Sequence, residues 1–67
     1  MEKQFLPHQQ RVIDELEELS NKSQKLSIFI IGELFIGLPD EEKKDLVEQL
    51  ETMEKYADIL ERRIDRF

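Results

Sequence analysis

The feature that most constrains this chain is a repeat of apolar residues through its last third. They recur at alternating steps of four and three residues, at Leu46, Leu50, Met53, Ala57, Leu60, Ile64 and Phe67. That spacing places all of these side chains along one side of an α-helix, as the stripe that packs against a second helix. The rest of the chain is therefore expected to supply a helix with a matching stripe.

The N-terminal half carries the same spacing. Its members are Val12, Leu16, Leu19, Ser23, Leu26 and Ile30. Pro7 suits the first turn of such a helix, because proline lacks the N–H that the first turn leaves unpaired. We predict one helix from about residue 7 to residue 31, since the polar stretch 20–23 contains no glycine or proline. The alternative is a break near Asn21.

Two glycines, Gly32 and Gly37, bracket a short apolar connection that is predicted over residues 32–38. Gly32 fits a stop for the first helix, because glycine readily takes the left-handed conformation that ends many helices. Pro39 and the acids after it fit the start of a second helix, predicted from about residue 39 to residue 66. The predicted fold is all-α. Residues 1–67 form a single domain, an antiparallel two-helix hairpin with a short N-terminal lead-in.

Many apolar residues lie off the two stripes. They are Ile13, Ile28, Phe29, Val47, Tyr56 and Ile59 along the helices and Phe5, Leu6, Leu34, Phe35 and Ile36 at the ends. Some of the end residues could fold back over the core, but apolar patches of this size are unusual on a soluble monomer. We therefore expect the hairpin to assemble into a helical homo-oligomer. Burial of a second face adds stability that a chain of 67 residues otherwise lacks.

Composition narrows the classes of function. The chain has 16 acidic and 10 basic residues and a net charge of -6, which disfavours binding to duplex DNA or RNA or to an anionic membrane. It has no cysteine, which excludes thiolate metal sites and suits a reducing cytoplasm, so a cytoplasmic location is expected. No catalytic, metal-binding or cofactor-binding motif is visible. We therefore do not expect an enzyme.

One charge asymmetry points to an anion site. Antiparallel pairing brings the end of the second helix beside the start of the first. The basic residues gathered there are Lys3, His8, Arg11, Arg62, Arg63 and Arg66. The free N–H groups of the first helical turn also favour an anion. Neutralisation by Asp14, Glu15 and Asp65 is the competing interpretation. Lys22 and Lys25 form a second basic pair further along the first helix.

Several segments resemble a known family. They are Pro7-His8-Gln9-Gln10-Arg11-Val12, Lys25-Leu26 with Phe29-Ile30, Phe35 and Leu38, and Gln49-Leu50, Met53, Tyr56, Leu60 and Arg63-Ile64. Together they cover nearly the whole chain and resemble the small helical-hairpin domain of phage-encoded anti-CBASS and Thoeris anti-defence cyclic-nucleotide sponges. The His-Gln-Gln-Arg-Val start and the Met…Tyr…Leu…Arg-Ile end are the distinctive parts.

The resemblance implies a non-enzymatic protein that sequesters nucleotide second messengers and so blocks bacterial anti-phage signalling. It implies a homo-oligomer, commonly a hexamer, that binds cyclic di- or trinucleotides or cyclic ADP-ribose isomers between its subunits and needs no cofactor. In such pockets an aromatic ring stacks on a base, and Lys or Arg meets the phosphates. The residues with that chemistry here are Phe5, His8, Arg11, Lys22, Lys25, Tyr56, Arg62 and Arg63.

The alternative function is a small helical module that binds or regulates another protein and has no nucleotide ligand. Two of the residues above also have structural interpretations. His8 would be a solvated residue in the first turn of the helix, and Tyr56 would pack in an interface.

Overall fold

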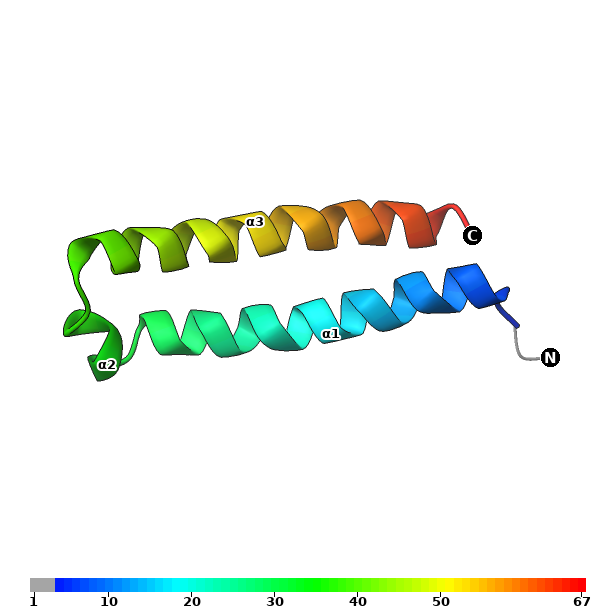
Figure 1. The fold of residues 1–67 in the computed structure, drawn as a ribbon. Helices are drawn as coiled ribbons and strands as arrows, with labels where there is room; N and C mark the ends of the chain where they lie inside the picture. The colour runs from blue at the N-terminus through cyan, green and yellow to red at the C-terminus, as the bar shows by residue number, and fades with distance from the viewer. Residues whose placement is uncertain (1–3) are drawn as a thin grey trace.

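The computed structural model describes residues 4–67 of the chain. The elements follow in the order α1 (Pro7–Ile30), α2 (Glu33–Ile36) and α3 (Asp40–Asp65), and the described range contains no strand. α1 and α3 lie side by side and run in opposite directions, and α2 lies in the connection between them (Figure 1). The predicted all-α fold is confirmed.

α1 continues without a break through Asn21. Two serines of this region satisfy their hydroxyls by bonding to the backbone of the helix. Ser23 donates to the Ser20 carbonyl at 3.0 Å, and Ser27 donates to the Gln24 carbonyl at 2.7 Å. These bonds satisfy polar groups that otherwise favour turns.

The start of α1 is capped from within the helix. Pro7 is the first helical residue, and the preceding Leu6 has no side chain that could accept a hydrogen bond. The Gln9 side chain instead accepts a hydrogen bond from the Leu6 N–H at 2.9 Å. One of the backbone donors at this end is thereby satisfied.

α1 ends at Ile30, just before Gly32, as the sequence predicted, but Gly32 does not take the left-handed conformation that is common at helix ends. No glycine in the described range has a positive φ, and Gly32 precedes α2 with φ -92° and ψ 170°. Its missing side chain matters for a different reason, because a Cβ atom there would lie 3.3 Å from the Phe29 carbonyl oxygen. One turn of helix follows. It packs the Phe35 ring edge-on against the Phe29 ring, with the centroids 6.4 Å apart.

α3 begins directly after Pro39, and its terminal charges suit its direction. Its first turn carries Asp40, Glu41 and Glu42, and its last turn carries Arg62 and Arg63. Acids stabilise the positive end of the helix dipole and bases stabilise the negative end. The charged residues at both ends therefore stabilise α3.

The hydrophobic core is a single line of contacts between α1 and α3. Leu60 (0% exposed) and Val12 (8% exposed) are the buried apolar residues of the described range, and the other members of the two stripes are half-buried. At the open end of the hairpin the rings of Phe5 and Phe67 lie with their centroids 6.2 Å apart. No second layer covers either helix, so even the stripe residues keep some exposure.

The molecule is long and thin. It measures 51 × 17 × 15 Å, with a radius of gyration of 15.5 Å. A compact domain of this length has a radius of gyration of about 11 Å. The accessible surface is 5711 Å², whereas scaling by mass gives about 4,500 Å² for a compact monomer. One copy therefore exposes about 1,200 Å² more than a compact protein of its mass.

Candidate functional site

Tyr56 on α3 contacts Glu15 on α1. The tyrosine hydroxyl donates a hydrogen bond to the Glu15 carboxylate and lies 2.5 Å from each of its oxygens. This hydrogen bond raises the pKa of Tyr56; desolvation and the negative charge of Glu15 add to the shift, and the positive charge of Arg63 opposes it. The side chain is 41% exposed. Part of the Tyr56 ring therefore remains open to a binding partner.

The contact between Tyr56 and Glu15 identifies the sides of α1 and α3 that face the same way. Residues at steps of four and three share one side of a helix. On α1 this row is Arg11, Glu15, Glu18, Lys22, Lys25 and Phe29. On α3 it is Asp45, Gln49, Thr52, Tyr56, Ile59 and Arg63, and Arg66 continues the row directly after the helix. We call the surface formed by these two rows the tyrosine face. All of its residues are exposed or half-buried.

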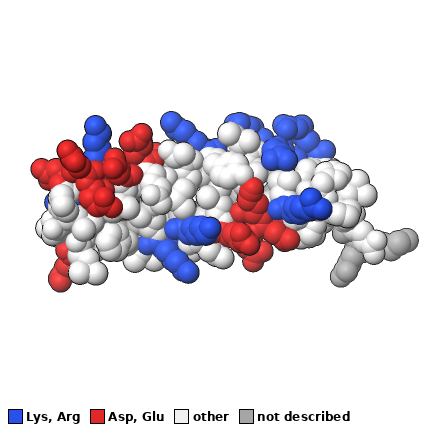
Figure 2. Space-filling model, in the orientation of Figure 1, with Lys and Arg blue, Asp and Glu red and all other residues white. Residues whose placement is uncertain are grey.

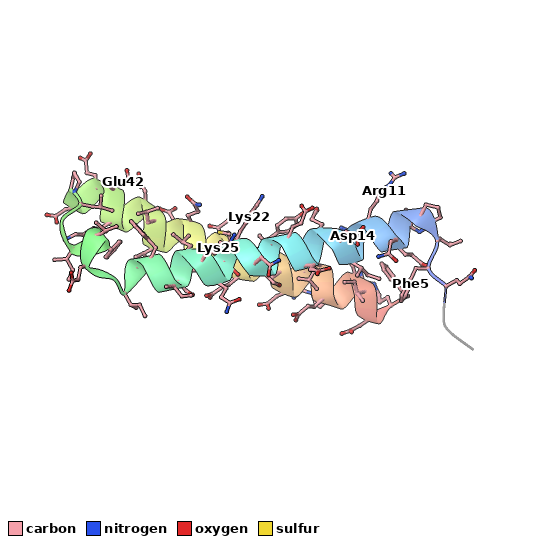
Figure 3. The ribbon with its side chains drawn as sticks, turned by 90° about the horizontal axis from the view of Figure 1, so that it is seen from below. Phe5, Arg11, Asp14, Lys22, Lys25 and Glu42 are labelled. Carbon is pink, nitrogen blue, oxygen red and sulfur yellow. The ribbon has the colours of Figure 1, made fainter. Side chains whose placement is uncertain are left out.

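Most of the predicted ligand-binding residues fall on the tyrosine face. They are Arg11, Lys22, Lys25, Tyr56 and Arg63. Figure 3 shows Arg11, Lys22 and Lys25 spread along α1. Arg11 and Lys22 are separated by about 16 Å at a rise of 1.5 Å per residue. One small anion therefore does not reach both of them on a single copy.

The other predicted residues lie elsewhere. The Phe5 ring packs against the ring of the last residue and helps to close the open end. His8 is exposed in the first turn of α1. Arg62 follows Tyr56 by six residues, which places it about 120° away from Tyr56 around α3. Lys3, expected at the basic end, lies outside the described residues.

The contact between Glu15 and Tyr56 was not predicted from the sequence. The available signal was its spacing, because Glu15 belongs to the same row as Arg11 and Lys22. That row is visible in the sequence. Its partner on α3 depends on how the two helices are offset along their axes, which the spacing alone does not specify.

Charge is distributed unevenly along the hairpin. Acidic side chains gather at the connection end, over the start of α3, and basic side chains gather over the end of α3 (Figure 2). At the open end the arginines are matched by acids in equal number. Over residues 4–15 and 61–67 the arginines are Arg11, Arg62, Arg63 and Arg66, and the acids are Asp14, Glu15, Glu61 and Asp65. The open end is therefore close to neutral as a whole.

The arginines and acids at the end of α3 lie on different sides of the helix. Arg63 and Arg66 belong to the tyrosine face, whereas Asp58, Glu61 and Asp65 follow one another at steps of three and four on another side. The tyrosine face is therefore locally basic at the open end, although that end is neutral overall.

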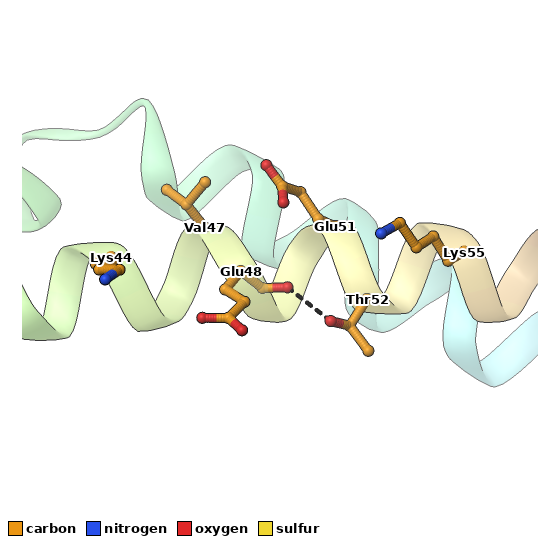
Figure 4. Close-up of a pocket in the computed structure, with 6 residues that line it drawn as sticks. All are labelled: Lys44, Val47, Glu48, Glu51, Thr52 and Lys55. Atoms are coloured by element: carbon orange, nitrogen blue, oxygen red, sulfur yellow. Dashed lines mark hydrogen bonds between the residues drawn. The ribbon is translucent and has the colours of Figure 1, made fainter.

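A shallow depression lies along α3, away from the core (Figure 4). It is lined by Lys44, Val47, Glu48, Glu51, Thr52 and Lys55. Within it the Thr52 hydroxyl donates to the Glu48 carbonyl at 2.9 Å. All of the lining residues come from one helix, which cannot enclose a ligand, and none is a predicted ligand-binding residue. The depression is therefore not the candidate site.

Residues 4–67 lack two other kinds of functional feature. No cluster of three or more His, Cys, Asp or Glu side chains there could hold a metal ion. No helix in that range is long and apolar enough to cross a membrane.

Comparison with known proteins gives two matches. Residues 6–66 match the Sequestin family. The chain is also 36% identical over 63 residues to the uncharacterized 7.5 kDa protein in the denB-rIIB intergenic region of enterobacteria phage T4, with 94% of this chain and 98% of that protein covered. No solved structure matches. The resemblance to a small phage family is thereby confirmed, and the chain belongs to the Sequestin family.

Proposed function

We propose that this chain is a non-enzymatic phage protein that binds cyclic nucleotide second messengers and withholds them from bacterial anti-phage signalling. The observation that carries the proposal is the match to a family whose name denotes sequestration, together with the similarity to a phage T4 protein. The ligand class follows from the sequence resemblance: cyclic di- or trinucleotides or cyclic ADP-ribose isomers. The place of action is the cytoplasm of the infected bacterium, where such messengers are made.

In this proposal the ligand is bound between copies of the chain. A single hairpin is 15 Å thick in its thinnest dimension, and one helix with its side chains is about 10 Å across. Neither face of the hairpin has a second layer that could cover a ligand. A second copy would supply the other wall of a pocket, as ligand sites generally require.

The exposed apolar surface supports assembly into a homo-oligomer. Ile28, Ile31, Leu34 and Ile36 are between 60% and 85% exposed. Removal of apolar surface from water is the main favourable term in association. The excess surface of about 1,200 Å² on one copy is of the order that each partner buries in a stable interface.

The tyrosine face offers the chemistry that a cyclic nucleotide needs. Arg11 and Arg63 carry guanidinium groups, which form charge-assisted and often bidentate hydrogen bonds with phosphates. The partly exposed Tyr56 ring offers a flat surface on which a base can stack. Lys22 and Lys25 add a second basic pair. These groups would hold an anion locally even though the chain as a whole has a net charge of -6.

The test is a thermal melt of the protein with each of these cyclic nucleotides. A ligand at ~100 times its Kd that binds only the folded state stabilises it by about 2.7 kcal/mol. For a domain of this size that corresponds to a rise in Tm of about 10–20 °C. Chromatography of the ligand after the protein is denatured should recover it intact, because no reaction is proposed.

The matched variants are Arg11→Ala and Lys55→Ala. Loss of a charge-assisted phosphate contact should weaken binding about tenfold or more for Arg11→Ala. Lys55→Ala removes the same charge outside the tyrosine face and should bind as the wild type does. If oligomeric protein shows neither a melting shift nor calorimetric heat with the panel, the proposal is wrong. The helical interaction module would then be the better interpretation.

A further inference from the structure

We propose that two copies of the hairpin pair through their tyrosine faces in opposite directions, so that the connection end of each copy lies over the open end of the other. α1 then packs against α1 and α3 against α3, which gives an antiparallel four-helix bundle. The inference rests on the homo-oligomer proposed above and specifies its interface and its symmetry.

The charges along α1 are self-complementary when the helix is reversed. In chain order the four residues between Arg11 and Phe29 are two acids followed by two bases, Glu15, Glu18, Lys22 and Lys25. When a second α1 crosses in the opposite direction, Glu18 of each copy faces Lys22 of the other. Glu15 likewise faces Lys25. The two-fold axis repeats both pairs, so every charge among these four meets an opposite charge.

The row on α3 is also self-complementary when the helix is reversed. Asp45 lies near its start, just after the acidic first turn, and Arg63 and Arg66 lie at its end. An antiparallel partner places these arginines over the acidic start of the other α3. The residues between them are uncharged and include the half-exposed Tyr56 and Ile59, at 41% and 43%. The α3 row therefore has an uncharged centre between ends of opposite charge.

The opposite side of the hairpin lacks this pattern. On α3 that side carries Glu51, Glu54, Asp58, Glu61 and Asp65, with few bases among them. A reversed copy there would place acids against acids, which costs free energy and rejects the pairing. Charge therefore favours the tyrosine face as the surface of contact.

Charge also selects the direction of pairing. If the open ends of two copies met, Arg11, Arg63 and Arg66 of both copies would be brought together. The antiparallel arrangement removes this repulsion.

The size of the face fits the proposal. The hairpin extends 51 Å by 17 Å in its two longest dimensions. A second copy packed along this length can cover the roughly 800 Å² per partner that a stable interface buries. The same register brings Arg11 opposite Phe29 of the second copy at each end of the pair. A phosphate-binding group and an aromatic ring then meet only in the dimer.

Charge reversal tests this pairing. Lys22→Glu with Lys25→Glu should shift the sedimenting mass at micromolar concentration to that of one chain, 8.1 kDa, because acids would then face acids. Glu15→Lys with Glu18→Lys should do the same. The variant with all four substitutions should associate again, because the reversed row is also self-complementary. Lys44→Glu with Lys55→Glu makes the same change in net charge outside this face and should associate as the wild type does.

Circular dichroism checks that each variant remains helical, and the salt dependence of the wild type gives a second readout. Its association should weaken as ionic strength rises, because exposed charge pairs are screened. An oligomeric wild type that is unaffected by salt and by the reversal at Lys22 and Lys25 overturns this interface but leaves the proposed assembly standing. A fourfold variant that stays at the mass of one chain also overturns the register. A wild type that remains at 8.1 kDa at all concentrations overturns both.

Discussion

Replacement of Leu60 by alanine should remove much of the stability of the hairpin. Leu60 has no exposed surface, in a core that is otherwise mostly half-buried. At such sites Leu→Ala costs about 2–5 kcal/mol, with the larger values where the surroundings cannot collapse into the cavity. At about 0.05–0.15 kcal/mol per residue, a chain of 67 residues is stable by about 3–10 kcal/mol. The loss is therefore comparable with the whole free energy of unfolding.

The assay is a circular dichroism melt, and Ile28→Ala is the control. Each change removes the same number of carbon atoms, but Ile28 is 60% exposed and should cost less than about 1 kcal/mol. Leu60→Ala should lower Tm by at least about 8 °C, at 4–8 °C per kcal/mol for a domain of this size. Both melts are run at several protein concentrations, because association also adds stability. Equal decreases in Tm for the two variants would refute the argument that one buried line of side-chain contacts holds the helices together.

Two further predictions concern contacts between the helices and at the open end. The chain has one tyrosine and no tryptophan, so the absorbance of the phenolate reports Tyr56 alone; its pKa should lie above 10.0 and fall towards that value in Glu15→Gln. The pKa of Tyr56 is higher in the folded state than in the unfolded state. The contribution of this hydrogen bond to stability should therefore be complete below pH ~10 and be lost as the pH rises through the folded pKa. The Tyr56→Phe variant should lack this pH dependence. Phe5→Leu should speed hydrogen exchange in the first turn of α1 and leave its centre protected, since the Phe5 ring packs at the open end; faster exchange along all of α1 would contradict this role.

The two long helices could be predicted because their signals are local. A stripe at steps of four and three specifies a helix and the side on which it packs. The unbroken course of α1 through Asn21 followed from the absence of glycine and proline in that stretch. The structure adds the reason that its polar residues do not end the helix, since Ser23 and Ser27 bond to the backbone of the preceding turn.

The connection could not be predicted in the same detail. Gly32 was expected to mark the end of α1, and it does, but its φ of -92° is not the left-handed conformation common at helix ends. The single helical turn of α2 packs the Phe35 ring against the Phe29 ring, so the path of the connection also depends on this contact between side chains. A rule based on the glycine alone does not predict that contact.

The candidate site could be predicted in residue type more than in position. Arg11, Lys22 and Lys25 share one row because their spacing is helical. Phe5 packs against the last residue instead, and Arg62 points to another side of α3 than Tyr56. The side on which Arg62 lies follows from its spacing to Tyr56 along α3. The position of Phe5 depends on the closure of the open end, a tertiary property that composition and spacing do not determine.

The thin core connects the stability of this protein with its proposed function. A hairpin with one buried line of contacts gains a large part of its stability from whatever covers its outer faces, whether a second copy or a ligand held between copies. If the ligand binds only where two copies meet, it must favour association, and association must favour the ligand by the same factor, because the two equilibria are linked. Under the proposed function, a small, acidic chain with Arg11 and Tyr56 on one face would bind an anion tightly only after it has paired. The messenger itself would then help to assemble its binding site.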